Sequence, residues 1–153
     1  MVTCYDAATS KILNETSVDA LLVGDSCAMV VHGFDSTIHA TLEMMVAHTA
    51  ATRRGAPDKV IVADMPFLSF RGSVEAATQS VMQLMRAGAN GVKLERCKGN
   101  AELISRLVDA GIPVMGHLGL TPQSIHEFGG FKMQARNDLA AQTLQEEALE
   151  LEE

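Results

Sequence analysis

The sequence predicts an α/β protein built on a parallel β-sheet. Short apolar runs with the length and β-branched content of strands buried on both faces alternate with segments of helical periodicity. Five such runs occur, at residues 1–4, 20–23, 60–63, 91–94 and 113–115. Strands that alternate with helices form parallel sheets with right-handed crossovers, whose ligands bind at the carboxyl ends of the strands.

Two of the intervening segments have the clearest helical pattern. Apolar side chains of residues 74–85 fall on one face with a 3.6-residue period, and those of residues 103–108 do the same. The expected caps are Ser73 and Asn100 at the amino ends and Gly88 and Gly111 beyond the carboxyl ends. The order strand, helix, strand, helix follows.

Composition limits the class of protein. The chain has 153 residues, of which 47% are hydrophobic and 20% charged, so we expect a single soluble globular domain over residues 1–153. Twelve Lys and Arg residues against nineteen Asp and Glu give a net charge of −7, and there is one Tyr and no Trp. The sequence therefore does not predict a basic, aromatic-rich surface, and nucleic acid is not an expected partner.

The cysteines and the hydropathy pattern indicate a cytoplasmic protein. Cys4, Cys27 and Cys97 are odd in number and lack C-x-x-C spacing, so we expect buried free thiols rather than disulfides or a zinc site. No charged-then-apolar leader opens the chain, and no apolar run approaches the ~18 residues that a membrane span needs. A membrane partner is not expected either.

Acidic residues stand at the carboxyl ends of successive predicted strands. Asp25 and Asp64 each end a buried run, and Lys93 and Glu95 end a third. Because parallel strand ends converge on one face, this pattern is typical of an α/β enzyme with a site for a hard metal ion. Each residue also has a structural alternative, since a strand-end Asp can cap a helix and Lys93 with Glu95 can form a cross-strand ion pair.

The absence of nucleotide-binding motifs favours a barrel over an open sheet. Neither G-x-G-x-x-G nor G-x-x-x-x-G-K-[ST] occurs in the sequence, whereas functional residues at several strand ends are typical of the (β/α)₈ TIM barrel. A complete barrel takes ~250 residues, or about 31 per unit. The chain therefore predicts about five βα units, the amino-terminal and central part of a TIM barrel without its last strands.

A series of motifs resembles the ketopantoate hydroxymethyltransferase family, also called 3-methyl-2-oxobutanoate hydroxymethyltransferase. The motifs are T-C-Y-D (3–6), L-L-V-G-D-S (21–26), H-G-F-D-S-T (32–37), H-T-A-A-T-R-R-G-A-P (48–57), A-D-M-P-F (63–67), R-A-G-A-N-G-V-K-L-E (86–95), G-H-L-G-L-T-P-Q-S (116–124) and F-G-G-F-K-M-Q-A-R (128–136). The last two are the most specific. The family's amino-terminal helix and the glutamate of its sixth strand, the proton acceptor, have no counterpart here.

The resemblance implies a folate-dependent transferase. The family moves a hydroxymethyl group from 5,10-methylenetetrahydrofolate to 3-methyl-2-oxobutanoate, giving 2-dehydropantoate for pantothenate synthesis through an enolate that Mg²⁺ stabilises. By this resemblance the metal ligands are Asp25, Asp64 and Glu95, the substrate-binding residues are Asp25, Ser26, Asp64 and Lys93, and the catalytic residue is His117. His117 also has a structural alternative, a buried histidine with its hydrogen bonds satisfied.

Other functions stay open at the level of sequence. A Mg²⁺-dependent 2-oxo-acid lyase or mutase of the phosphoenolpyruvate-mutase and isocitrate-lyase type shares acids at strand ends, although its K-K-C-G-H loop is absent. A truncated, non-catalytic chain is the alternative from a different class. The resemblance also implies a homo-oligomer, a decamer in the family, and an open five-stranded sheet has apolar edges to cover.

Overall fold

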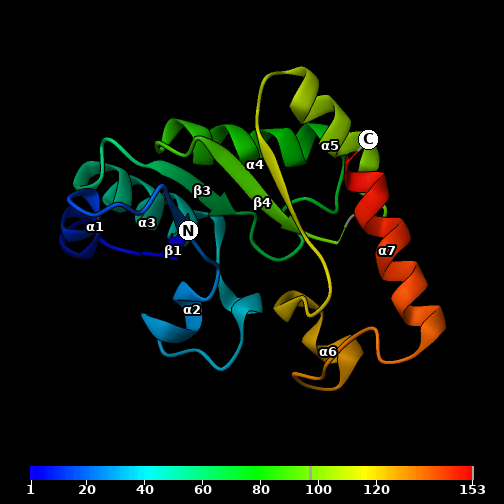
Figure 1. The fold of residues 1–153 in the computed structure, drawn as a ribbon. Coiled ribbons are helices and arrows are strands. Elements are labelled where there is room, and N and C mark those ends of the chain that lie inside the picture. The colour runs from blue at the N-terminus through cyan, green and yellow to red at the C-terminus, as the bar shows by residue number, and fades with distance from the viewer. Residues whose placement is uncertain (97, 153) are drawn as a thin grey trace.

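A computed structural model describes residues 1–96 and 98–152. Its centre is a parallel sheet of five strands in the order β1-β2-β3-β4-β5 (Figure 1). The strands are β1 (Val2–Thr3), β2 (Ala20–Val23), β3 (Val60–Asp64), β4 (Gly91–Glu95) and β5 (Val114–His117). The five predicted strands are thus confirmed. Each strand pairs with the next one in the chain, as successive βα units of a barrel wall do.

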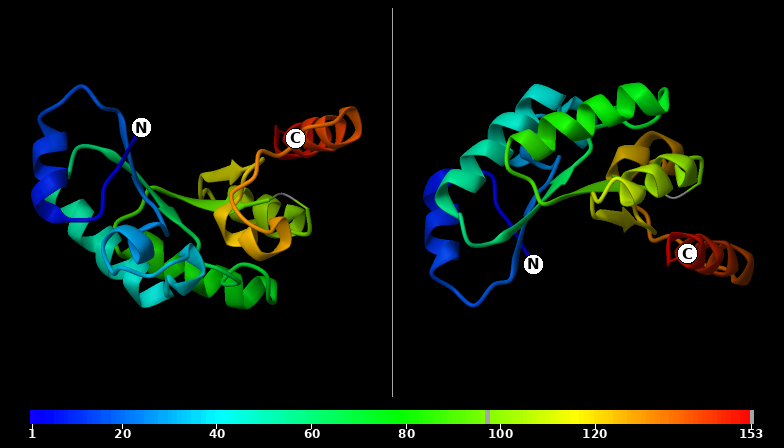
Figure 2. Two further views of the ribbon diagram at one scale, coloured as in Figure 1. Left: turned by 90° about the horizontal axis from the view of Figure 1, so that it is seen from below. Right: turned by 90° about the horizontal axis from the view of Figure 1, so that it is seen from above.

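Helices follow the strands in the predicted alternation. The longer crossover helices are α1 (Ala7–Asn14), α3 (Leu42–Gly55), α4 (Val74–Arg86) and α5 (Ala101–Asp109). Figures 1 and 2 show α1, α3 and α4 side by side on one face of the sheet, and α5 packs next to α4. The carboxyl ends of the strands lead to short elements: α2 (Cys27–Val30), η1 (Thr37–His39), η2 (Pro122–Ser124) and α6 (Ile125–Phe128). The last helix is α7 (Asp138–Glu152).

The helix caps lie at the four predicted positions. The Ser73 hydroxyl accepts a hydrogen bond from the Ala76 amide at 3.2 Å, as an N-cap does. Gly88 and Gly111 adopt the left-handed backbone that ends helices, with φ of 110° and 81°. Asn100 also occupies the predicted N-cap position, before α5, but its side chain makes no cap bond. Its Nδ2 donates instead to the Arg96 carbonyl at 2.8 Å.

The core lies between the sheet and the crossover helices. Leu21, Ile61 and Leu94 on the strands belong to one buried cluster with Val81 and Leu84 on α4, and all five are fully buried. The cysteine prediction is confirmed for Cys4 and Cys27, which are buried free thiols, while Cys97 lies outside the described residues. None of the helices in the described part of the chain is long and apolar enough to cross a membrane.

Burial is uneven across the sheet. All residues of β4 are buried, as the sequence predicts for a strand covered on both faces. That prediction is wrong for β1, whose two residues are exposed, and for β5, which has none buried. The reason is position, since within the described chain β1 and β5 each pair with one neighbour only.

Candidate functional site

The predicted site residues of three strands meet at the carboxyl edge of the sheet. Asp25 follows β2, Asp64 ends β3, and Lys93 and Glu95 lie on β4. Each of the four is at most 9% exposed. The parallel register sets Asp64 beside Lys93 and Glu95 beside His117 of β5, so alternate positions of adjacent strands face one site.

The two aspartates are in direct contact. The Asp25 amide donates to Asp64 Oδ2 at 3.1 Å, and Lys93 Nζ lies 2.9 Å from Asp64 Oδ1. Asp64 Oδ2 therefore accepts a hydrogen bond, and Oδ1 has an ion pair as its contact. Lys93, predicted to bind a substrate carboxylate, is held first by Asp64, and its other N–H groups stay available as donors.

Gln123 connects the site across the sheet, and sequence reasoning missed it. Its Nε2 donates to Asp25 Oδ2 at 2.8 Å and to the Met65 carbonyl at 2.9 Å. Its backbone amide donates to Glu95 Oε2 at 2.9 Å. The residue is 7% exposed and lies in η2, the turn after β5. The side chain and the backbone amide of Gln123 thus hold the ends of β2, β3 and β4 in fixed positions relative to one another.

Glu95 lies between this turn and His117. Its Oε2 accepts from Gln123, and its Oε1 is 3.5 Å from His117 Nδ1. That distance is long for a hydrogen bond, and among the described residues the buried Nδ1 has no closer partner. His117 is one-third exposed, so one part of its ring faces the solvent side of the site.

Ser26 belongs to a second polar group beside the carboxylates. Its hydroxyl lies 2.8 Å from the Tyr5 hydroxyl. His48 Nδ1 is 2.7 Å from the Tyr5 carbonyl, so this nitrogen carries the proton, and His48 Nε2 can accept from His32 Nε2 at 2.9 Å. The spacing of these two histidines in the sequence does not suggest metal ligands, and in the structure they hold the segment that carries Tyr5.

Negative charge exceeds positive charge in the buried site. Three carboxylates, of Asp25, Asp64 and Glu95, face one ammonium group, that of Lys93. Burial, and then the charge of Asp64, raise the pKa of Asp25 to about 7. Burial also raises the pKa of Asp64, against the opposing effect of Lys93. Without a further cation, full ionisation of the three carboxylates is thus unfavourable.

The donor set suits a hard divalent cation. Carboxylate oxygens are the ligands that Mg²⁺ prefers, and Asp25 Oδ1 has no hydrogen-bond partner among the described residues. In the described geometry, however, no three His, Cys, Asp or Glu side chains already form a metal-binding group. The predicted ligands Asp25, Asp64 and Glu95 share one site, but Lys93 and Gln123 engage several of their oxygens.

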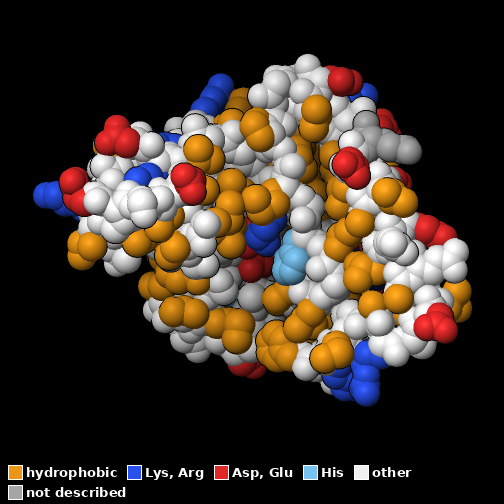
Figure 3. Space-filling model, viewed as in Figure 1, with side chains coloured by type: hydrophobic (Ala, Val, Ile, Leu, Met, Phe, Trp, Pro, Cys, Tyr) orange, Lys and Arg blue, Asp and Glu red, His pale blue; other side chains and the backbone are white. Residues whose placement is uncertain are grey.

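The site opens to the surface through a hollow. Figure 3 shows basic, acidic and histidine side chains at the bottom of a depression in the middle of this face, with hydrophobic side chains around it. Apolar walls around a few charged groups are typical of small-molecule sites.

Comparison with known proteins identifies the family. The model of the family described as ketopantoate hydroxymethyltransferase matches residues 1–153. The chain belongs to this family. It is 52% identical over 153 residues to the 3-methyl-2-oxobutanoate hydroxymethyltransferase of Francisella tularensis subsp. tularensis (strain SCHU S4), and 48% identical to that of Bdellovibrio bacteriovorus. Each alignment covers all of the chain and 58% of the relative, so the chain spans little more than half the length of these family members.

Solved structures show the same fold in more distant proteins. A putative phosphonomutase from Burkholderia cenocepacia J2315 has a TM-score of 0.68 at 17% identity, covering 99% of this chain and 63% of that one. The trigonal form of 2,3-dimethylmalate lyase, a PEP mutase/isocitrate lyase superfamily member, has a TM-score of 0.64 at 17% identity, covering 97% and 52%. The predicted fold is confirmed, since the chain forms part of a TIM barrel.

Proposed function

We propose that the chain carries the metal and 2-oxo-acid part of a 3-methyl-2-oxobutanoate hydroxymethyltransferase. The reaction is the transfer of a hydroxymethyl group from 5,10-methylenetetrahydrofolate to 3-methyl-2-oxobutanoate, with Mg²⁺ as the metal. Support comes from relatives about 50% identical that carry this name and from the contact between Asp25 and Asp64. The observation that carries the proposal is the buried excess of three carboxylates over one ammonium group.

A divalent cation would balance this excess and polarise the ketone of the bound acid. Asp25 and Asp64 are the residues proposed to hold it, with Glu95 beside them. Lys93 favours the ionised form of Asp64 through the 2.9 Å ion pair and offers its remaining donors to the carboxylate of the substrate. Ser26, oriented by Tyr5 at 2.8 Å, is a second donor toward that carboxylate.

His117 is proposed to hold or relay a proton. It is one-third exposed, and Glu95 lies 3.5 Å from its Nδ1. A carboxylate in that position favours a proton on Nδ1 and directs the other ring nitrogen outward. An imidazole ring can accept a proton at one nitrogen and release one from the other, so His117 suits proton transfer next to a carbon acid.

Calorimetric titration with Mg²⁺ and 3-methyl-2-oxobutanoate tests the proposal. Asp25→Asn should lower Mg²⁺ affinity at least ~tenfold, because it removes a charged ligand at the site. The matched control is Asp19→Asn, which changes an exposed aspartate just before the amino end of the same strand and should leave binding unchanged.

A second ligand makes the same titration specific for the ketone. 3-Methylbutanoate has the carboxylate but lacks the keto oxygen, so it should bind weakly even with Mg²⁺ present. Equal binding of the two acids, or equal Mg²⁺ affinity of the wild type and Asp25→Asn, would contradict the proposal.

A further inference from the structure

The Tyr5 hydroxyl reaches the proposed site from the segment that follows β1. It lies 2.8 Å from the hydroxyl of Ser26, a residue 21 positions later in the chain and directly after Asp25. We infer that Tyr5 is a positioning residue that sets the direction of the Ser26 hydroxyl and, through it, the affinity for the carboxylate of the oxo acid. This inference rests on the proposed function for its ligand. It adds that the contact controls binding of the acid and not of the metal.

Ser26 stands where a serine often caps a helix, directly before α2. Its hydroxyl nevertheless makes no cap bond. Its backbone is helical, with φ −57° and ψ −11°, and not extended as in a typical N-cap. Within the described chain the partner of this hydroxyl is Tyr5. Capping of α2 therefore does not account for the serine, and its hydroxyl is available to a ligand.

Gly24 provides the space in which the Ser26 hydroxyl lies. A Cβ atom at residue 24 would be 2.8 Å from Ser26 Oγ and 3.6 Å from Asp64 Oδ2. The first distance is too short for unbonded atoms, so a side chain at residue 24 would push the hydroxyl away, and glycine permits the close approach. The serine hydroxyl and the Asp64 carboxylate thus flank the same glycine, which places the hydroxyl beside the buried carboxylates.

Tyr5 is itself held in place from two sides. The Cys4 amide donates to the Leu22 carbonyl at 2.9 Å, which continues the pairing of β1 with β2 up to Tyr5. His48 of α3 donates from Nδ1 to the Tyr5 carbonyl at 2.7 Å, and the two rings lie edge to face with their centroids 6.3 Å apart. A tyrosine side chain has only two torsions to fix. A fixed backbone therefore places its hydroxyl well.

The protonated phenol is suited to direct the serine. Burial raises the pKa of Tyr5, and the charges of Asp64 and Asp25 act in the same direction, so the phenol keeps its proton. A serine hydroxyl that donates to a carboxylate can still accept on its oxygen, and the phenol supplies that hydrogen bond. Each bond in such a chain strengthens the next. Without the phenol, the serine hydroxyl is free to rotate away from the ligand.

Calorimetric titration of 3-methyl-2-oxobutanoate, with and without Mg²⁺, tests the inference. Tyr5→Phe removes only the hydroxyl, so the acid should bind about fivefold more weakly, whereas the Mg²⁺ affinity measured without the acid should not change. Ser26→Ala should weaken the acid about tenfold. Tyr5→Phe combined with Ser26→Ala should lose no more than Ser26→Ala alone, because the phenol acts through the serine.

Thr49→Val is the matched control. It removes a fully buried hydroxyl on α3 that has no hydrogen-bond partner among the described residues. Both affinities should stay at the wild-type value in this variant. A loss of acid affinity in Thr49→Val equal to that in Tyr5→Phe would mean that any lost buried hydroxyl disturbs the site, and it would overturn the inference.

The tyrosine spectrum supplies a readout that a purely structural role would not change. The chain has one Tyr and no Trp, so its tyrosine absorbance comes from Tyr5 alone. Binding of the acid should shift this absorbance in the wild type. The shift should be absent in Ser26→Ala at saturating acid, because the phenol then has no contact with a group that binds the ligand. If Tyr5→Phe fails to fold, this comparison decides.

The outcomes separate the inference from the proposed function. Wild-type acid affinity in Tyr5→Phe, an equal loss of Mg²⁺ affinity, or a combined loss equal to the product of the two single losses would overturn the inference and leave the proposed function standing. Weaker acid binding in Tyr5→Phe, with no dependence on Mg²⁺ in any of the proteins, would reject the metal part of the proposed function and leave the role of Tyr5 standing. Absence of acid binding to the wild type would reject both.

Discussion

Strands β4 and β5 are neighbours, paired from Val92 with Val114 to Glu95 with His117, yet they lie in different surroundings. All five residues of β4 are buried, and none of β5 is. The helices that follow differ in the same way: α5 buries Leu103 and Leu107, whereas the 15 residues of α7 include no buried side chain. Strand pairing in a sheet therefore does not by itself produce a packed unit. A packed unit also needs apolar side chains that are buried against a helix.

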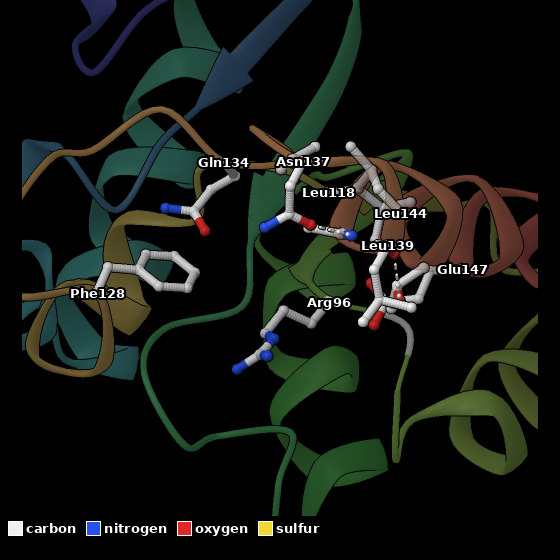
Figure 4. Close-up of a pocket in the computed structure, with 12 residues that line it drawn as sticks. Arg96, Leu118, Phe128, Gln134, Asn137, Leu139, Leu144 and Glu147 are labelled. Carbon is white, nitrogen blue, oxygen red and sulfur yellow. Dashed lines mark hydrogen bonds between the residues drawn. The ribbon is translucent and has the colours of Figure 1, made fainter.

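The residues of the proposed site fall on the packed side of this division. The carboxylates belong to the ends of β2, β3 and β4, inside the packed block. A cavity of about 390 Å³ beside α7 is lined by none of them (Figure 4). Figure 2 shows α7 at the far end of the molecule from α1. Regions with few buried contacts open at low free-energy cost. The carboxylate end should thus be preformed, whereas α7 should open more readily.

The most direct test of this difference is to truncate one leucine in the packed block and one on α7. Leu94 of β4 is fully buried, so Leu94→Ala should lower the free energy of unfolding by about 4 kcal/mol. Leu149 of α7 is 58% exposed, and Leu149→Ala should change it by less than about 0.5 kcal/mol. Urea denaturation followed by circular dichroism measures both. Similar losses in the two variants would mean that α7 is packed as firmly as the sheet.

The packed block is also the part that sequence reasoning predicts well. For β2, β3 and β4, apolar periodicity, β-branched content and the flanking acids agree, and the predicted boundaries hold to within one residue. The convergence of Asp25 and Asp64 then follows from the parallel order alone. Burial of β1 and β5 was predicted wrongly, because an apolar run does not reveal whether a strand has one neighbour or two.

The charge of the carboxylate end predicts a pH dependence that sharpens the contrast. The pKa of Asp25 is about 7 in the folded chain, against 3.8 for an unperturbed aspartate. Between these values the folded state binds more protons than the unfolded state. The free energy of unfolding of the metal-free protein should therefore fall as pH rises from about 4 to 7, by roughly 3 kcal/mol, and this penalty persists above pH 7.

Asp25→Asn isolates this effect, because the amide cannot ionise. The variant should be more stable than the wild type at pH 8 without metal, and the difference should shrink toward pH 4. Glu150→Gln on exposed α7 is the control, and its pH profile should follow that of the wild type. Urea midpoints at a series of pH values measure all three proteins. A wild-type profile in Asp25→Asn would show that Asp25 is not the group responsible.

Gln123 marks the limit of what spacing can reveal. It lies 98 residues from Asp25 in the chain, in a three-residue turn after the fifth strand. No periodicity places such a turn over the ends of earlier strands. The available signal was chemical, since G-H-L-G-L-T-P-Q-S puts proline at the start of a turn five residues after a strand-end histidine, with the amide of glutamine next to it.

Replacing glutamines on both sides of the division gives the smallest expected effect. Gln123→Leu keeps the approximate size but removes two buried hydrogen bonds, leaving Asp25 Oδ2 and the Met65 carbonyl without this donor, at a cost of about 2 kcal/mol. Gln142→Leu on α7 removes one exposed bond to Glu146 and should cost less than about 0.5 kcal/mol. Denaturant midpoints measure these costs.

The same two variants separate positioning from stability. If Gln123 fixes which oxygen of Asp25 faces the metal, Gln123→Leu should also weaken Mg²⁺ binding severalfold. This is measured without denaturant, at a temperature where the protein remains folded. Gln142→Leu should bind Mg²⁺ as the wild type does. A destabilised Gln123→Leu with unchanged Mg²⁺ affinity would assign Gln123 to holding the strand ends together and leave the orientation of Asp25 to its own backbone contact with Asp64.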